Sequence, residues 1–193
     1  MQKTSRIIVW ATVTVLVLLV LLVTQFTDFG QTEVQWNEAV AYTMILLVAG
    51  GAYELIQWLK TRSKMYRVAF GVGSAGLLLL GWVSGAVGII GSENNPVNLM
   101  YWGIPLVMII GLVVSRLRPG GMAYTLFVAA LVQLLIPIAA LIISPNVSWG
   151  GAGVIGVFIL NSIFAVTFII SGLLFRCVSI TSSIQSNGQK PVV

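Results

Sequence analysis

The stretch Lys60–Arg67, KTRSKMYR, places four basic residues between two long apolar runs. An apolar run of about 20 residues can cross about 30 Å of hydrocarbon as a helix. Lys and Arg are enriched in the loops on the cytoplasmic side of a membrane. The stretch therefore predicts a short cytoplasmic loop between two membrane-spanning helices. Because successive loops alternate between the two sides of a membrane, this loop sets the predicted side of all the others.

The composition as a whole is that of an integral membrane protein. The chain has 193 residues, of which 58% are hydrophobic and 8% charged, and its mean hydropathy is +1.02. Soluble domains carry about 25% charged residues. The formal net charge of +5 comes from short basic clusters between apolar runs, which is typical of membrane topology signals. The lipid bilayer is thus the expected partner, and nucleic acid is not.

Six apolar runs are long enough to span a membrane. Backbone groups in lipid must find their hydrogen bonds within the segment, so each run is expected to be a helix. The predicted fold is an all-α, polytopic transmembrane bundle. A single six-helix domain is expected over residues 1–177, with a polar, frayed cytoplasmic tail over 178–193. The six spans cover residues 7–24, 39–59, 68–91, 99–117, 122–143 and 151–175.

The charged residues support a count of six. With six spans, all ten basic residues fall on one side of the membrane, whereas a count changed by one scatters them over both sides. Because positive loops face the cytoplasm, both chain termini are expected to be cytoplasmic. Four acidic residues fall on the opposite side: Asp28, Glu33, Glu38 and Glu93.

Two residue types that carry much of enzyme chemistry are nearly missing. The sequence has no histidine and one cysteine, which is Cys177. This excludes His-ligated haem, a zinc site of Cys and His, and a Ser-His-Asp triad. We therefore expect no cofactor, no metal site and no catalytic residues, and we interpret the protein as a non-enzyme.

Glu54 is the one charged residue well inside a predicted span, with Gln57 on the same helix face. A lone carboxylate in lipid is costly, so it is usually paired, protonated or hydrated. Glu54 and Gln57 form a candidate intramembrane polar site, either a relay for protons or cations or a ligand contact. The alternative is a structural anchor, in which Glu54 reaches a basic residue near the cytoplasmic end; the candidates are Arg62, Arg67, Arg116 and Arg118.

Small residues and prolines are expected to shape the packing of the helices. Gly81 and Gly85 are separated by one helical turn in the third span, and Gly88 follows. Such spacing allows close approach of helix backbones in membranes. We predict that these glycines pack against another helix of the bundle; the alternatives are contact with a second subunit or a pore-lining helix. Pro105 and Pro137 lie inside the fourth and fifth spans and predict kinks.

The string GSENNPVNLMY, Gly91–Tyr101, joins the third and fourth spans at the outer face. Gly91 is expected to end one helix and Asn98 to cap the next, which would make the string a tight turn. Alternatively, its oxygen-rich side chains form an outward-facing cation or ligand site, since hard cations prefer oxygen ligands. The residues of this candidate outer-loop site are Glu93, Asn94, Asn95 and Asn98.

The same string, with Ala52–Leu55 and Arg118–Ala123, resembles a family of small bacterial inner-membrane proteins that carries G-S-E-x-N-P-x-N-L-M-Y. The match covers about Asn37–Ile143. It implies a location in the bacterial inner membrane and a four-helix core of the second to fifth spans, to which the first and last helices are added. It implies no activity. The family often has an acidic residue at the position of Asn94, so this chain is poorly equipped for a two-carboxylate cation site.

Three functions remain open from the sequence. The first is a non-catalytic accessory or scaffold subunit, or a homo-oligomeric membrane component. The second is a small ion channel or proton-coupled transporter that uses Glu54. The third is a lipid- or quinone-binding membrane protein, with aromatic residues around an apolar pocket.

Overall fold

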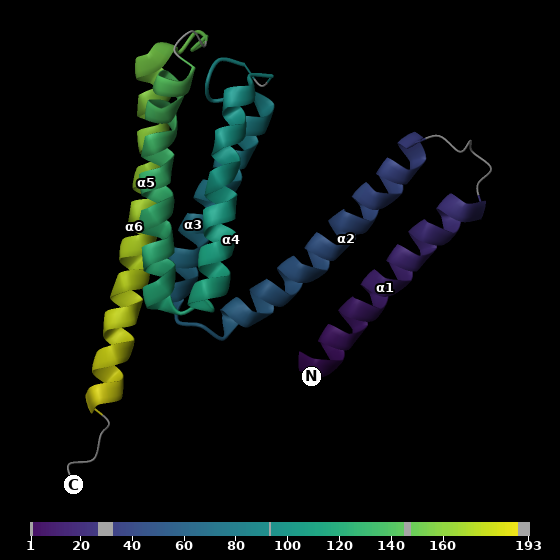
Figure 1. The fold of residues 1–193 in the computed structure, drawn as a ribbon. Helices are drawn as coiled ribbons and strands as arrows, with labels where there is room; N and C mark the ends of the chain where they lie inside the picture. Colours follow the sequence, from purple (N-terminus) through teal and green to yellow (C-terminus); the bar gives the residue numbers. More distant parts are fainter. Residues whose placement is uncertain (1, 27–32, 93, 145–147, 189–193) are drawn as a thin grey trace. The chain divides into compact units, whose positions relative to one another are not determined.

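The computed structural model (Figure 1) describes the backbone of residues 2–26, 33–92, 94–144 and 148–188. Side chains are described for residues 5–19, 40–92, 94–144 and 148–185. All regular structure in these ranges is helical, with six α-helices and one 3₁₀ helix, which confirms the predicted all-α class. The chain divides into two compact units, Met1–Arg62 and Ser63–Val193. The single domain expected over 1–177 stays a prediction.

Five helical segments are long and apolar enough to cross a membrane: Val40–Lys60, Lys64–Ala86, Pro96–Ser115, Pro119–Ile143 and Gly153–Gln185. They correspond to the second to sixth predicted spans. For the first predicted span, the described side chains form a shorter apolar helix, Ser5–Leu19. The protein is thus a multi-pass membrane protein by the length and composition of its helices.

The first unit is a helical hairpin. Helix α1 (Gln2–Phe26) and helix α2 (Glu33–Lys60) run antiparallel and pack against each other (Figure 1). A small residue sets their spacing, since a Cβ atom at Gly50 would lie 3.3 Å from the ring of Trp10. Val13 is the described apolar side chain of α1 that this packing buries.

The second unit contains α3 (Lys64–Ala86), η1 (Pro96–Trp102), α4 (Gly103–Ser115), α5 (Pro119–Ile143) and α6 (Gly153–Gly188). Helix α5 packs against α4 and α6, and α3 packs against α6. The expected core of the second to fifth spans is therefore wrong, because α6 belongs to this core. The reason is one buried face of α6 with helical spacing, which includes Val157, Asn161, Phe164, Phe168 and Phe175.

Two helix ends differ from the predicted spans. Helix α3 ends at Ala86, before the predicted end at Gly91, because Gly88 and Gly91 adopt φ values of +75° and +77° that a right-handed helix does not contain. Helix α6 continues to Gly188, so the tail that we expected to be frayed is helical over its described residues, 178–188. Its Ser and Thr hydroxyls bond back to carbonyls of the same helix, as Ser183 does to Ser179.

The expected kink at Pro105 is also absent from α4. That helix begins at Gly103, so Pro105 lies in its first turn, where the missing N–H has no intrahelical partner to lose. The preceding residues form η1, and the change from 3₁₀ to α geometry occurs just before the proline. Pro137 does lie inside α5, as predicted.

The glycines that pack helices together are not the predicted ones. In α3, a Cβ at Gly73 would lie 2.8 Å from Ser171 Oγ, and one at Gly76 would lie 2.9 Å from Thr167 Cγ2, both on α6. A Cβ at Gly81 or Gly85 would meet nothing within 4 Å, and Gly88 follows the end of the helix. Packing of Gly81 and Gly85 within the described bundle is therefore wrong, whereas packing of Gly88, and contact of the three glycines with a second chain, stay predictions.

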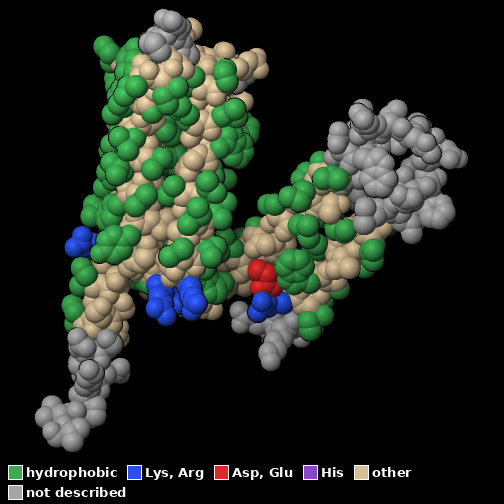
Figure 2. Space-filling model, viewed as in Figure 1, with side chains coloured by type: hydrophobic (Ala, Val, Ile, Leu, Met, Phe, Trp, Pro, Cys, Tyr) green, Lys and Arg blue, Asp and Glu red, His purple; other side chains and the backbone are tan. Residues whose placement is uncertain are grey.

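Basic residues gather at one end of the second unit (Figure 2). The helix bounds place them there, since α3 begins, α4 ends and α5 begins at this end. We call it the basic end; its described residues are Lys64, Arg67, Arg116, Arg118 and Arg176. This clustering is what the positive-inside pattern requires of α3 to α6. The side of the membrane that it faces stays a prediction.

Candidate functional site

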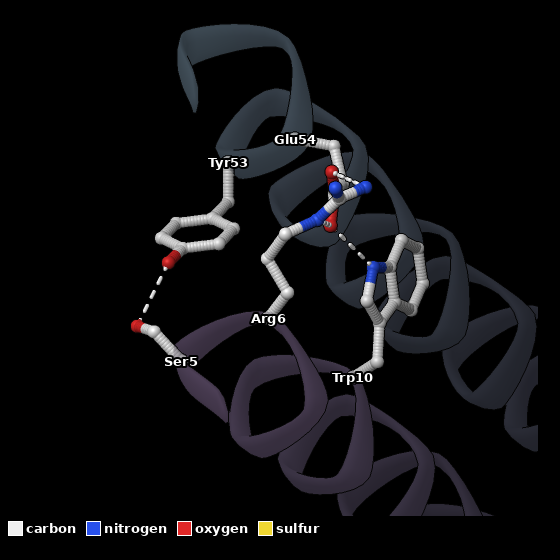
Figure 3. A network of polar contacts seen from close by, with 5 residues as sticks. All are labelled: Ser5, Arg6, Trp10, Tyr53 and Glu54. Carbon is white, nitrogen blue, oxygen red and sulfur yellow. Dashed lines mark hydrogen bonds and ion pairs between the residues drawn. The ribbon is translucent and has the colours of Figure 1, made fainter. Parts of the chain in front are cut away.

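The predicted intramembrane carboxylate, Glu54, is paired with an arginine from the neighbouring helix (Figure 3). Arg6 Nη2 lies 2.6 Å from Glu54 Oε2, and Arg6 Nε donates a hydrogen bond of 2.9 Å to Glu54 Oε1. The indole N–H of Trp10 donates to the same Oε1 at 3.0 Å. Beside this group, the hydroxyls of Ser5 and Tyr53 lie 3.1 Å apart.

This geometry supports the structural-anchor interpretation of Glu54. A bidentate guanidinium–carboxylate pair neutralises the charge that the lipid disfavours. The Glu54 side chain is 23% exposed, against 54% for Arg6, so the carboxylate is the more enclosed partner of the pair. Gln57, the other predicted member, is half-buried one turn away and is not part of the described hydrogen bonds of this group.

The arginine partner is not among the four that the sequence suggested. The alignment of α1 with α2 in the hairpin could have identified Arg6 as the partner of Glu54. In an antiparallel pair, Trp10 lies against Gly50 and Arg6 faces Glu54 one turn further along both helices. A search for opposite charges at matching depth in α1 and α2 therefore identifies the pair.

Asn98 of the outer loop is a buried organiser of the turn, with 5% of its surface exposed. Its Oδ1 accepts hydrogen bonds from the backbone N–H groups of Ile89 at 3.2 Å and Ile90 at 2.9 Å. Its Nδ2 donates to the carbonyl of Ser92 at 2.7 Å. Asn98 therefore ties η1 back to the residues after α3, and the predicted cap of the fourth helix is wrong.

Asn95 provides the cap instead. Its Oδ1 accepts from the N–H of Val97 at 3.1 Å at the start of η1, and its Nδ2 donates to the carbonyl of Ile90 at 3.0 Å. Both amides thus bond to backbone groups, which favours the tight-turn interpretation. Asn94 is exposed, and Glu93 lies outside the described residues. Among the described residues, no group of three His, Cys, Asp or Glu could hold a metal ion.

A second buried polar group joins η1, α5 and α6. The Tyr101 hydroxyl and Gln133 Nε2 both donate to Asn161 Oδ1, at 3.1 and 2.9 Å, and Asn161 Nδ2 donates to the carbonyl of Val157 at 2.8 Å. The side chains of Gln133 and Asn161 are fully buried. Gln133 and Asn161 could be predicted as polar residues inside spans, but Tyr101, the second donor to Asn161, could not.

A slot lies between α3 and α4. Two cavities, of about 440 Å³ and about 160 Å³, lie along these two helices and share Leu77; η1 adds to the walls of the larger one, and α5 and α6 add to those of the smaller one. Together they form the α3–α4 slot. The larger cavity lies toward η1, where Ser84, Gly85 and Trp102 line it. The smaller cavity lies toward the basic end, with Phe70 of α3 and Met108 of α4 in its walls.

Comparison with known proteins adds no assignment. No protein-family model, no curated protein and no solved structure matches this chain. The resemblance to small bacterial inner-membrane proteins therefore stays a prediction.

Proposed function

We propose that this protein is a non-catalytic accessory or scaffold component of the bacterial inner membrane. It works within a larger assembly, formed with other membrane proteins or with copies of itself. Both chain termini face the cytoplasm in this proposal, because the basic end of the Ser63–Val193 unit carries Lys64, Arg67, Arg116 and Arg118.

The single observation that supports the proposal is the structural use of the polar side chains within the helices. Glu54 is held by Arg6 and Trp10, and Asn161 is held by Tyr101 and Gln133. Each group joins one helix to another, as polar side chains commonly do inside membranes. A scaffold needs such joints, whereas an enzyme or transporter needs a polar group that is available to a substrate or an ion.

The alternative of a channel or proton-coupled transporter depends on Glu54. A carboxylate that relays an ion must exchange its partner during transport. The Arg6–Glu54 pair, with two nitrogen–oxygen contacts of 2.6 and 2.9 Å, instead fixes the carboxylate between two helices. This geometry favours the scaffold over the transporter.

Native mass spectrometry of the protein, extracted gently from its own membrane, tests the proposal. A complex with other membrane proteins, or a symmetric oligomer, is the expected result. A monomer that survives every mild extraction would contradict it. Ion flux in liposomes, compared between the natural chain and Glu54→Gln, tests the alternative. Ion flux that is lost in Glu54→Gln would contradict the scaffold function and support the transporter.

A further inference from the structure

The α3–α4 slot is held open by hydrogen bonds at its two ends. Near the basic end, the Tyr66 hydroxyl donates to the carbonyl of Leu117, just after α4, at 2.9 Å. At the other end, Asn98 of η1 accepts from the N–H groups of Ile89 and Ile90, just after α3. Between these two joints, α3 packs on α6 and α4 packs on α5. These contacts at both ends keep α3 and α4 apart and maintain the slot between them.

Small residues on α3 create the width of the slot. Gly81 and Gly85 face it, and a Cβ at either position would meet nothing within 4 Å. The larger cavity, of about 440 Å³, falls in the range of about 300–1,000 Å³ that small-molecule pockets occupy. A ten-residue helix, about 10 Å wide and 15 Å long, fills about 1,200 Å³. The slot therefore suits a single flexible chain better than a helix of another protein.

The lining of the slot is graded from polar to apolar. Toward η1, Ser84 and Trp102 line the larger cavity, and their polar side-chain atoms make no hydrogen bond among the described residues. Toward the basic end, the walls are mostly apolar, with Phe70, Leu77 and Met108. The two serines there are Ser74 and Ser171, and the Ser171 hydroxyl donates to the carbonyl of Ala69. The walls of both cavities carry no Asp, Glu, Lys or Arg among the described residues.

From this lining we propose that the α3–α4 slot binds one hydrocarbon chain of a membrane lipid with an uncharged head. The chain lies along Leu77 and Met108, and a carbonyl or hydroxyl oxygen of the head accepts hydrogen bonds from Ser84 and Trp102. An anionic head would leave its charge without a partner at this end, because the described basic residues of the unit lie at the other end. In a bilayer, lipid hydrocarbon chains surround the helices, so they are available to enter the slot.

Photocrosslinking of the full chain in phosphatidylcholine vesicles tests this site. The probe is hexadecanol with a diazirine in its chain, and mass spectrometry of the digested protein locates the label. Labelling of the slot walls at Leu77 and Met108 is the expected result. Gly81→Leu should reduce this labelling by about fivefold or more, because the leucine side chain occupies the room of several buried methylenes.

Gly71→Leu is the matched control. Gly71 is also on α3, is exposed, and a Cβ there would meet nothing within 4 Å, but it does not line the slot. Its labelling should equal that of the natural chain. Equal labelling of the slot walls in Gly81→Leu and Gly71→Leu would overturn the proposal, since it would reflect ordinary surrounding lipid. If Gly81→Leu does not fold, as judged by gel filtration and circular dichroism, Gly85→Leu provides the same comparison.

A second probe tests the uncharged head. Hexadecanoate with the same diazirine has the same chain and an anionic head. It should label the slot walls less than the alcohol does, and Ser84→Ala should reduce labelling by the alcohol alone. Stronger labelling by the carboxylate would overturn the assignment of the head. A crosslink from Gly81→Cys to a second copy of the chain, with no lipid label, would show that protein fills the slot.

Discussion

The Tyr66 hydroxyl lies 2.9 Å from the carbonyl oxygen of Leu117, a residue held in the left-handed region with φ of 59°. The ring of Tyr66 also packs edge-on against Phe175, with 5.0 Å between the ring centroids. One buried side chain thus joins the start of α3 to the turn after α4 and to α6. The unusual backbone at Leu117 is part of this joint.

Replacing Tyr66 with Phe should remove the hydrogen bond and keep the ring contact. The expected loss is about 1 kcal/mol of unfolding free energy, which is typical of one net hydrogen bond. Unfolding by titration with sodium dodecyl sulfate in mixed micelles measures it. Tyr124→Phe is the control, because Tyr124 is 74% exposed. Equal stability of the two variants would mean that the joint contributes nothing.

Arg116 ends α4 with φ of 49°, in the left-handed region that non-glycine residues enter at an expense of about 1–2 kcal/mol. Arg116→Gly should therefore be more stable than Arg116→Ala by about 1 kcal/mol. Because both variants lose the same charge, their difference isolates the backbone effect. A more stable alanine variant in the same detergent titration would contradict the left-handed helix end.

Asn161 and Gln133 should respond unequally to replacement by Leu. Asn161→Leu leaves the buried donors of Tyr101 and Gln133 without their acceptor, so we expect a loss of about 2–4 kcal/mol. Gln133→Leu removes one donor and a buried Oε1 that has no hydrogen-bond partner among the described residues. Its loss should be below about 1 kcal/mol. Parallel detergent titrations check the order, and a costlier Gln133→Leu would contradict this network.

Gly76 and Gly81 should differ sharply although both lie on α3. A leucine at Gly76 would press on Thr167 and Phe168 of α6, so Gly76→Leu should destabilise the protein by about 1–3 kcal/mol or prevent folding. Gly81→Leu should leave stability unchanged, since a Cβ there meets nothing within 4 Å. Thermal unfolding in detergent compares the two. If Gly81→Leu destabilised the protein and Gly76→Leu did not, α3 would pack through the region of Gly81 and not through that of Gly76.

The Arg6–Glu54 pair should tolerate exchange of its partners. Arg6→Glu places two carboxylates together in α1 and α2 and should loosen the hairpin, as should Glu54→Arg. The double variant restores opposite charges and should regain most of the lost resistance to proteolysis between α1 and α2. Lys60→Glu is the control, since Lys60 is exposed at the end of α2. If the double variant did not regain protease resistance, the hydrogen bond from Trp10 and the packing of the arginine side chain would contribute more to the hairpin than the charge of Arg6.

The sequence was sufficient for the class of fold and for the position of most helices. Apolar length predicts the helices because lipid permits few other structures, and Glu54 stands out because a charge inside a span is rare. The membership of the core was wrong because periodicity shows that α6 has a buried face without showing what covers it. Packing of Gly73 and Gly76 on α6 depends on contacts that sequence spacing does not contain.

The outer-loop residues show a similar limit of local reasoning. A spacing rule assigned Asn98 to the nearest helix start, whereas its amide bonds to Ile89 and Ile90, eight or nine residues earlier. The two positive φ values at Gly88 and Gly91 turn the chain so that these N–H groups meet Asn98. Glycine indicates that a turn is possible, but the direction of the turn comes from the three-dimensional structure.

Helix α6 is longer than a membrane span requires. A helix of 36 residues extends about 54 Å at 1.5 Å per residue, nearly twice the thickness of the hydrocarbon layer. The part of this helix from Arg176 to Gly188 extends about 18 Å beyond the basic end. In the proposed orientation, with the basic end at the cytoplasmic surface, this segment would carry helical structure about 18 Å into the cytoplasm.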